Sequence, residues 1–303
     1  MKTLCLYNPL ARKVRGSDIF KLLKGRDYWG DVYFHALSPI DLTEPKWLRY
    51  LDDAKQVLIL GGDGTLHHVA QFLVHRDTLV HIIPYGTAND LGRWIGLGSD
   101  LLQNTIALET GKTVAYDAIT ANGRYVFSGG GFGLGYLIAE NSHHLSGNNV
   151  GWLIKKLAGT NLYTLLLIWN IIRHPIIHYM HQCRLGDSKK EVDTPLVVFT
   201  NQAMLGKGVL LAPDTMSTDG RYQLIIFRNT NSRSILLTLC GIKLKLKRND
   251  PWLDRSEVQQ ITLEWRIPVP AFADGELLPP EKTWKIICHR GALKLRVPIT
   301  FNG

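Results

Sequence analysis

The chain has 303 residues, 45% of them hydrophobic, and a formal net charge of +9. That length provides enough apolar surface for one large or two ordinary domains. Four widely spaced cysteines argue against a cysteine metal module and indicate reduced thiols in a cytosolic protein. The basic charge suits an anionic lipid surface or a polyphosphate substrate. No nucleic acid partner is expected, because no recognisable nucleic-acid-binding module accompanies the charge.

The first predicted elements alternate between strand and helix. Residues 3–7 read as a strand that ends at Asn8-Pro9, and residues 17–24 have helical spacing. The loop between them contains three basic side chains that could contact phosphate or could simply be solvated. A second strand is predicted for residues 31–36 and a helix for residues 43–55. The apolar run at the start of the chain is too short for a signal peptide.

A glycine turn, Gly61-Gly62-Asp63-Gly64-Thr65, follows the apolar strand candidate 57–60 and precedes helical spacing over residues 66–74. Glycines let the backbone approach a ligand closely, and the free N–H groups at a helix N-terminus suit a phosphate. A bare carboxylate repels phosphate, so Asp63 makes more sense if it handles a cation or a proton. Taken alone, a purely structural turn explains this stretch equally well.

A second strand–turn unit follows. The strand candidate 80–83 runs into Pro84-Tyr85-Gly86-Thr87-Ala88-Asn89-Asp90. Two such units in succession indicate one phosphate-binding cleft between neighbouring parallel strands. A helix is predicted for residues 101–109, so residues 1–112 are expected to form an α/β domain with a parallel sheet.

The pattern changes after residue 112. The turn Ala121-Asn122-Gly123 lies between two short strand candidates and predicts a β-hairpin. The glycine-rich stretch 129–135 contains a formal G-x-G match but lacks the context of a dinucleotide-binding fold. Later strand candidates are residues 196–200, 209–211, 222–227, 258–263, 284–288 and 293–297. They predict a mainly antiparallel β-sandwich over residues 113–303, whose last strand could return to the first domain.

Two further stretches bear on membranes. The uncharged run 157–172 is shorter than the roughly 20 residues that span hydrocarbon, so we expect a buried helix and no transmembrane segment. The stretch 243–248 alternates basic residues with leucine. It could be a solvated edge strand that resists aggregation or a basic patch that faces a membrane.

The sequence GGDGT at 61–65, followed by P-x-G-T-x-N-D at 84–90, resembles the diacylglycerol kinase catalytic domain family. That family belongs to a superfamily with sphingosine kinases and NAD kinases. Later stretches extend the resemblance over nearly the whole chain and are most similar to YegS-type bacterial lipid kinases. The resemblance implies an ATP-dependent lipid kinase whose acceptor is a hydroxyl of diacylglycerol, a sphingoid base or phosphatidylglycerol. It implies a cytoplasmic protein, peripheral at the inner membrane face, in which residues 157–172 line an acyl pocket.

The resemblance also assigns a nucleotide site to the two glycine turns. Asp63 would organise Mg²⁺ or assist proton transfer, and Asn89 and Asp90 would link the two sides of the cleft. The expected nucleotide-binding residues are Gly61, Gly62, Asp63, Gly64, Thr65, Thr87, Asn89 and Asp90.

Two D-G elements complete the implied site. In relatives, one such aspartate and nearby main-chain carbonyls hold a divalent cation, which here implies Asp219 with carbonyls near Met216 and Arg221. Spacing alone favours a turn with a solvent-facing Asp219. The sequence Asp274-Gly275-Glu276 resembles the D-G-E element, so Glu276 is the expected general base. This assignment requires the second domain to fold back over the GGDGT turn.

Departures from the family pattern keep other functions open. His68 stands where lipid kinases usually carry glutamate, and Ala36 where a nucleotide-contacting threonine is common. These changes fit a catalytically impaired lipid-binding protein of the same fold, whereas the intact acidic residues of the D-G elements oppose it. NAD kinase is a third reading, because it shares GGDGT, but its G-S-T-A-Y signature is missing from this chain.

Overall fold

In the computed structural model the chain divides into two compact units. Residues 1–118 and 290–303 form unit 1, and residues 119–289 form unit 2. The described residues are 2–9, 16–38, 45–86, 88–146, 181–185, 190–205, 209–228, 235, 238, 241–242 and 253–303. The predictions for Thr87, the basic loop, the run 157–172 and the stretch 243–248 lie outside them.

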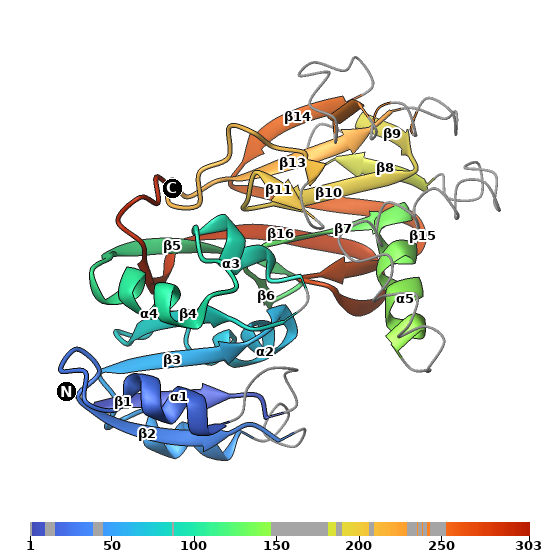
Figure 1. The fold of residues 1–303 in the computed structure, drawn as a ribbon. Helices are drawn as coiled ribbons and strands as arrows, with labels where there is room; N and C mark the ends of the chain where they lie inside the picture. Colours follow the sequence, from blue (N-terminus) through green and yellow to red (C-terminus); the bar gives the residue numbers. More distant parts are fainter. Residues whose placement is uncertain are drawn as a thin grey trace. The chain divides into compact units, whose positions relative to one another are not determined.

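Unit 1 contains the predicted parallel sheet (Figure 1). The strand order is β16-β4-β3-β1-β2, and β3 pairs in parallel with both β1 and β4. Every residue of β3 is buried, as its unbroken apolar sequence predicts for a strand covered on both faces. The strands are β1 (Lys2–Tyr7), β2 (Asp31–Ala36), β3 (Gln56–Gly61), β4 (Leu79–Pro84) and the end of β16 (Glu276–Val297).

The helices of unit 1 are short. They are α1 (Gly16–Leu23), the 3-10 helix η2 (Lys46–Tyr50), α2 (Asp63–Ala70), α3 (Asp90–Trp94) and α4 (Leu101–Glu109). The helix predicted for residues 43–55 is therefore wrong over most of its described length. The N–H groups of Leu51 and Ala54 bond to carbonyls three residues earlier, and the N–H of Lys55 already bonds to Lys2 of β1. The chain turns tightly there because it is entering the sheet.

Unit 2 is mainly antiparallel, in the strand order β14-β13-β10-β7-β15-β16. Alternate residues of β10 belong to two separate apolar clusters, so this central strand is buried on both faces. The elements are β5 (Lys112–Ala121), β6 (Arg124–Val126), β7 (Gly129–Gly133), α5 (Leu134–Ser146), β8 (His181–Leu185), β9 (Lys190–Thr194), β10 (Leu196–Thr200), β11 (Met204–Leu205), β12 (Val209–Leu210), β13 (Tyr222–Phe227), β14 (Leu253–Val258), β15 (Gln260–Ala273) and β16. β5 and β16 continue from one unit into the other.

The strands predicted at 258–263, 284–288 and 293–297 have the wrong boundaries. β14 ends at Val258, β15 has 14 residues, and β16 has 22 residues. Prolines at 268 and 270 lie within β15. Register shifts in the β15–β16 ladder, between Glu264 and Val269 and between Val269 and Ala271, accommodate them without ending the strand.

Residues 129–133 of the glycine-rich stretch form β7, which pairs with β10 and β15, and residues 134–135 begin α5. A Cβ atom on Gly130 would lie 2.5 Å from the Phe199 ring, and one on Gly135 would lie 2.4 Å from the Phe272 ring. These glycines therefore make room for aromatic packing.

Candidate active site

The two predicted glycine turns lie in contact at the carboxyl ends of β3 and β4. A Cβ atom on Gly86 would lie 2.4 Å from the Cα of Gly62, so only glycine fits there without movement. The N–H of Tyr85 donates to the carbonyl of Gly61 at 2.7 Å. The backbones of the two turns consequently form one continuous surface with few side chains, as close approach to a phosphate requires.

Asp63 fastens one turn to the other. Its Oδ2 accepts a hydrogen bond from the N–H of Asn89 at 2.6 Å, and its Oδ1 accepts one from the N–H of Asp90 at 2.8 Å. Both donors lie at the start of α3, where a negative charge is favourable. This contact explains a carboxylate among glycines. The roles of Asp63 in Mg²⁺ binding or proton transfer stay predictions.

Asn89 shapes the second turn. Its backbone is left-handed, with φ of 55°, a conformation that asparagine tolerates better than most residues. Its side chain accepts from the N–H of Gly86 at 2.7 Å and donates to the carbonyl of Gly86 at 2.9 Å. Asn89 thus holds Gly86 against Gly62, while its main chain holds Asp63.

Asn8 is part of this edge, although the sequence did not assign it to the site. Its N–H donates to the carbonyl of Leu60, and its Nδ2 donates to Thr65 Oγ1 at 3.4 Å. Thr65 is packed beneath Gly61, where a Cβ would lie 2.6 Å from the threonine Cβ. The strands that follow β1 in the chain, β2 and β3, lie on opposite sides of it in the sheet. α/β sheets commonly bind ligands at such a reversal of strand order, outside the carboxyl ends of the strands. The sequence feature that could have indicated this role is the Asn8-Pro9 dipeptide at the end of the first strand.

Asp274 organises the other acidic element. With Gly275 it forms a two-residue turn between Ala273 and Glu276, and both turn residues have positive φ. Its carboxylate accepts hydrogen bonds from the N–H groups of three residues before and within β7, namely Phe127 at 2.9 Å, Ser128 at 2.7 Å and Gly129 at 3.3 Å. Glu276 begins β16 and is partly exposed. The turn therefore fixes the position of the predicted base.

Asp219 lies between β12 and β13 and is exposed. Its Oδ1 accepts from the N–H of Arg221 at 2.9 Å, so the aspartate closes its own turn. Among the described residues, no group of three or more His, Cys, Asp or Glu side chains could hold a metal ion. The predicted site needs one carboxylate and two carbonyls, near Met216 and Arg221. Those hard oxygen donors fit Mg²⁺, and the site stays a prediction.

His68 lies on α2, directly after the first turn. It is partly exposed, whereas the neighbouring His67 is buried, and the two ring centroids lie 5.6 Å apart with nearly perpendicular planes. The two imidazoles therefore face different surroundings.

Two family models match the chain, one in each half. Residues 3–121 match the model of the diacylglycerol kinase catalytic domain, and residues 148–296 match that of the YegS C-terminal NAD kinase beta sandwich-like domain. "Putative lipid kinase" from Staphylococcus carnosus is 24% identical over 73% of this chain and 70% of its own length. "Probable lipid kinase YegS-like" from Shewanella frigidimarina is 25% identical over 76% of this chain and 73% of its own length.

The fold itself has been seen in solved structures. A structure described as a putative diacylglycerol kinase from Bacillus anthracis superposes with a TM-score of 0.77. It is 18% identical and covers 98% of this chain and 97% of its own. The predicted fold class, an α/β domain with a parallel sheet followed by a β-sandwich, is confirmed. By these matches the chain combines a diacylglycerol kinase catalytic domain with a YegS-type C-terminal domain, and it is similar to proteins named as putative or probable lipid kinases.

Proposed function

We propose that the chain is an ATP-dependent lipid kinase that transfers the γ-phosphate to a lipid hydroxyl. The single observation that carries this proposal is the pair of glycine turns, packed backbone to backbone and fastened by Asp63. A turn used only to reverse the chain needs no second glycine turn pressed against it. A phosphate-binding surface needs free backbone and a shape fixed in advance.

Phosphoryl transfer asks little covalent chemistry of a protein, so position and charge carry most of the catalysis. Gly61, Gly62, Gly64 and Thr65 would bind the nucleotide phosphates, with Asn89 and Asp90 holding the opposite turn. Asp219, with carbonyls near Met216 and Arg221, would hold Mg²⁺. The ion supplies positive charge that offsets the charge developing on the phosphate oxygens.

Glu276 would act as general base. The acceptor hydroxyl oxygen forms a bond to the γ-phosphorus while the bond from that phosphorus to the bridging oxygen breaks, which releases ADP. The hydroxyl proton passes to the Glu276 carboxylate. A positioned carboxylate contributes about 10²–10⁴-fold to such a step. The proposal requires Glu276 to reach the acceptor beside the nucleotide of unit 1.

The acceptor would be diacylglycerol, a sphingoid base or phosphatidylglycerol, reached by peripheral contact with the inner membrane face. None of the helices in the described part of the chain is long and apolar enough to cross a membrane. A lipid-binding protein without turnover is the second candidate, because His68 and Ala36 depart from the family pattern.

Transfer of labelled γ-phosphate from ATP, with Mg²⁺, to lipids in mixed micelles tests the proposal. The panel contains the three lipid classes, with NAD and water as further acceptors. We expect labelled product from one lipid class and none without Mg²⁺. Label on NAD would instead identify an NAD kinase. Binding of ATP without transfer to any acceptor would overturn the kinase proposal in favour of the lipid-binding candidate.

A further inference from the structure

Unit 1 contains a groove that the proposed kinase reaction does not use. It has a volume of about 290 Å³ and is lined by Lys2, Thr3, Leu4, Asp31, Val32, Tyr33, Tyr50, Asp53 and Ala54. Two ladder pairs of the sheet, Lys2–Asp31 and Leu4–Tyr33, lie side by side in it. The short helix η2 and the turn after it form the opposite wall. The five-residue η2 is too short to cover this face of β1 and β2 completely.

The groove lies far from the glycine turns. Lys2 and Asp31 are the first residues of β1 and β2, whereas the turns follow the last residues of β3 and β4. The lining residues of β1 and β2 are the first three of each strand, so the remaining three residues, roughly 10 Å of strand, separate the groove from the edge where the turns lie. A ligand in the groove would therefore not compete with nucleotide for the same atoms.

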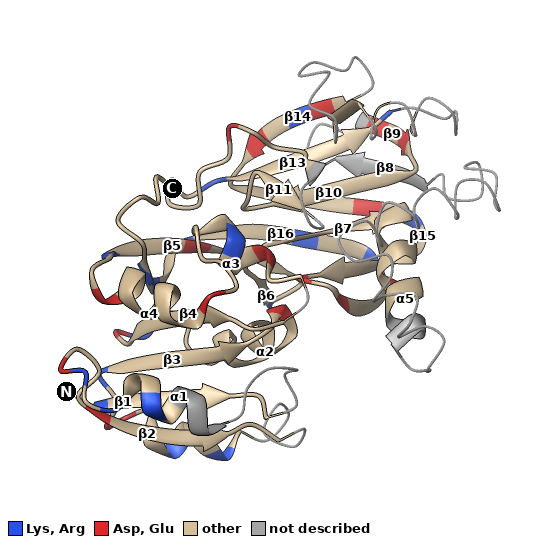
Figure 2. Ribbon diagram, in the orientation of Figure 1, with Lys and Arg blue, Asp and Glu red and all other residues tan. Residues whose placement is uncertain are grey.

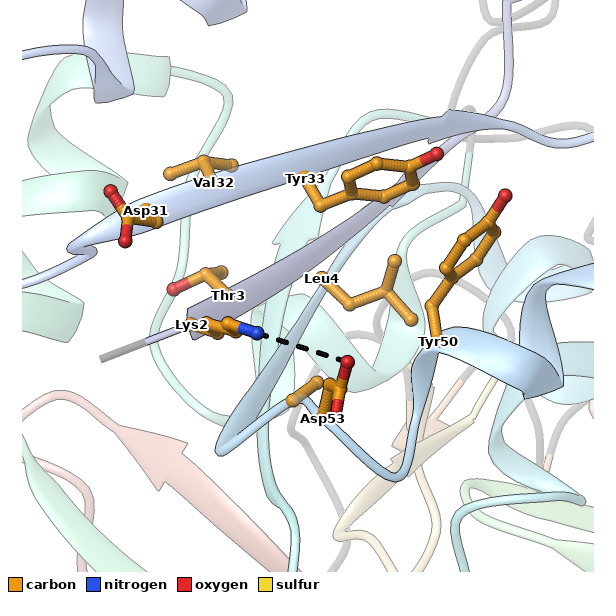
Figure 3. Close-up of a pocket in the computed structure, with 9 residues that line it drawn as sticks. Lys2, Thr3, Leu4, Asp31, Val32, Tyr33, Tyr50 and Asp53 are labelled. Carbon is orange, nitrogen blue, oxygen red and sulfur yellow. Dashed lines mark ion pairs between the residues drawn. The ribbon is translucent and has the colours of Figure 1, made fainter.

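One end of the groove is a fixed aromatic wall (Figure 3). The rings of Tyr33 and Tyr50 lie 4.5 Å apart, tilted by 39°, and Tyr33 is 51% exposed. Arg49 donates a hydrogen bond to the Tyr50 hydroxyl at 2.6 Å and covers that ring at 4.7 Å. The hydroxyls of the two tyrosines are also hydrogen-bonded, which raises the pKa of Tyr33 and lowers that of Tyr50. Tyr50 is thus held in place, and Tyr33 presents ring surface to a ligand.

The other end carries net negative charge. Lys2 pairs with Asp53 at 3.8 Å, which leaves the Asp31 carboxylate without an ion-pair partner among the described residues. Charges of both signs gather at the end of unit 1 that carries the N-terminus (Figure 2). Two carboxylates and one ammonium line the groove, so the excess charge of its lining is negative although the chain as a whole carries +9, and the Arg49 guanidinium lies at the opposite, aromatic end. Such a groove disfavours phosphate and favours a cation.

We propose that this groove binds a small organic ammonium that carries an aromatic ring. The ammonium lies at Asp31, where charge-assisted hydrogen bonds are available, and the ring packs on Tyr33 beside Leu4. The groove combines a mostly apolar wall with a few convergent polar groups, which is the usual composition of a small-molecule site. Its volume suits a molecule of about one ring with a short side chain.

The test uses phenethylammonium as the probe, with binding to the full-length protein followed by isothermal titration and by ligand-observed NMR. The anion 3-phenylpropionate has the same ring and a similar chain and serves as the charge control. Asp31→Asn and Tyr33→Ala are the test variants. Asp27→Asn is the matched control, because Asp27 is also exposed on unit 1 but does not line the groove. Thermal melting verifies that each variant is folded.

We expect saturable binding of phenethylammonium that weakens about tenfold in each test variant and less than twofold in Asp27→Asn. Binding of 3-phenylpropionate should be at least about tenfold weaker, and ATP should not displace the cation. Absence of saturable binding would overturn the proposal. Equal affinity for the cation and the anion, equal affinity in all three variants, or displacement by ATP would do the same.

Discussion

Asp63 in unit 1 and Asp274 in unit 2 are both followed by glycine, and both use their carboxylates to hold main-chain N–H groups of another segment. Asp63 accepts two such bonds at the start of α3, and Asp274 accepts three next to β7. Asp63 is itself part of the glycine turn predicted to contact nucleotide. Asp274 lies two residues before the predicted base.

Asp219 marks the difference. It is also followed by glycine, yet the bond described for its side chain is to its own turn, at the N–H of Arg221. The same dipeptide therefore serves two physical purposes. Where the carboxylate is partly buried among N–H donors, it fixes the backbone. Where it is exposed, as at Asp219, it closes its own turn.

Replacing Asp274 by alanine should give the largest loss of stability. The N–H groups of Phe127, Ser128 and Gly129 would lose their charged acceptor. The unfolding free energy should fall by about 4 kcal/mol. Urea unfolding measures this loss. Asn retains one acceptor oxygen and tolerates the left-handed backbone of this position, so Asp274→Asn should lose only about half as much. Equal losses in the two variants would contradict this account of the carboxylate.

A pH titration distinguishes the units, because unit 1 contains the buried His81. Its Nε2 bonds to Gln56 at 2.9 Å, and burial, with the positive charge of Arg296, lowers its pKa from 6.5 to about 3. The folded protein keeps this ring neutral, whereas the unfolded chain takes up a proton below 6.5. Unfolding free energy should therefore fall as pH drops from 6.5 toward 3, by about 3 kcal/mol at pH 4.

His81→Gln should flatten that pH dependence, and unfolding curves at several pH values measure it. The variant is expected to be less stable at pH 7, because a buried ring is lost, but its slope between pH 4 and 6.5 should be smaller. An unchanged slope would show that other groups cause the acid sensitivity.

Asp63→Asn should have a smaller effect on stability than Asp274→Ala. The NH₂ group of the new amide would face the N–H of either Asn89 or Asp90, so one hydrogen bond would be lost. The unfolding free energy should fall by about 2 kcal/mol. Because the two turns would separate, ATP affinity should fall as well, which a titration with a fluorescent ATP analogue measures. Asp27→Asn, an exposed control on the same unit, should change neither quantity. Lowered stability with unchanged ATP affinity would argue against the turns as the nucleotide site.

Asp219→Asn should have the smallest effect on stability, below about 0.5 kcal/mol, because the side chain is exposed and closes only its own turn. Activity should nevertheless require more Mg²⁺, since the proposed site would lose its one carboxylate. Phosphate transfer measured at increasing Mg²⁺ concentrations checks this. An unchanged Mg²⁺ requirement would show that Asp219 does not hold the cation.

Local patterns predicted much of unit 1. Helix α4 follows the predicted range 101–109, and the two glycine turns lie at the ends of parallel strands as their spacing indicated. These features depend on neighbouring residues, which a sequence displays directly. The predicted helix 43–55 was wrong because the chain after η2 turns tightly before Lys55 bonds to Lys2 of β1, and that contact depends on a residue far away in the chain.

Long-range packing limited the prediction of unit 2 and of the site. The prolines within β15 look like strand ends until the register shifts that accommodate them are known. The glycine at 135 is explained by the Phe272 ring, which lies 2.4 Å from where its Cβ would be and which no local pattern shows. The hydrogen bonds of Asp63 and Asp274 join residues 26 and about 146 positions apart, so no local motif displays them.

Turnover of the Glu276→Gln variant is the most direct test of the proposed kinase, measured as phosphate transfer from ATP to the preferred lipid. The change removes the base and preserves its shape. The account predicts product formation about 10²–10⁴-fold slower, with ATP affinity and unfolding free energy unchanged. Turnover equal to that of the parent protein would contradict the role of Glu276 as the base.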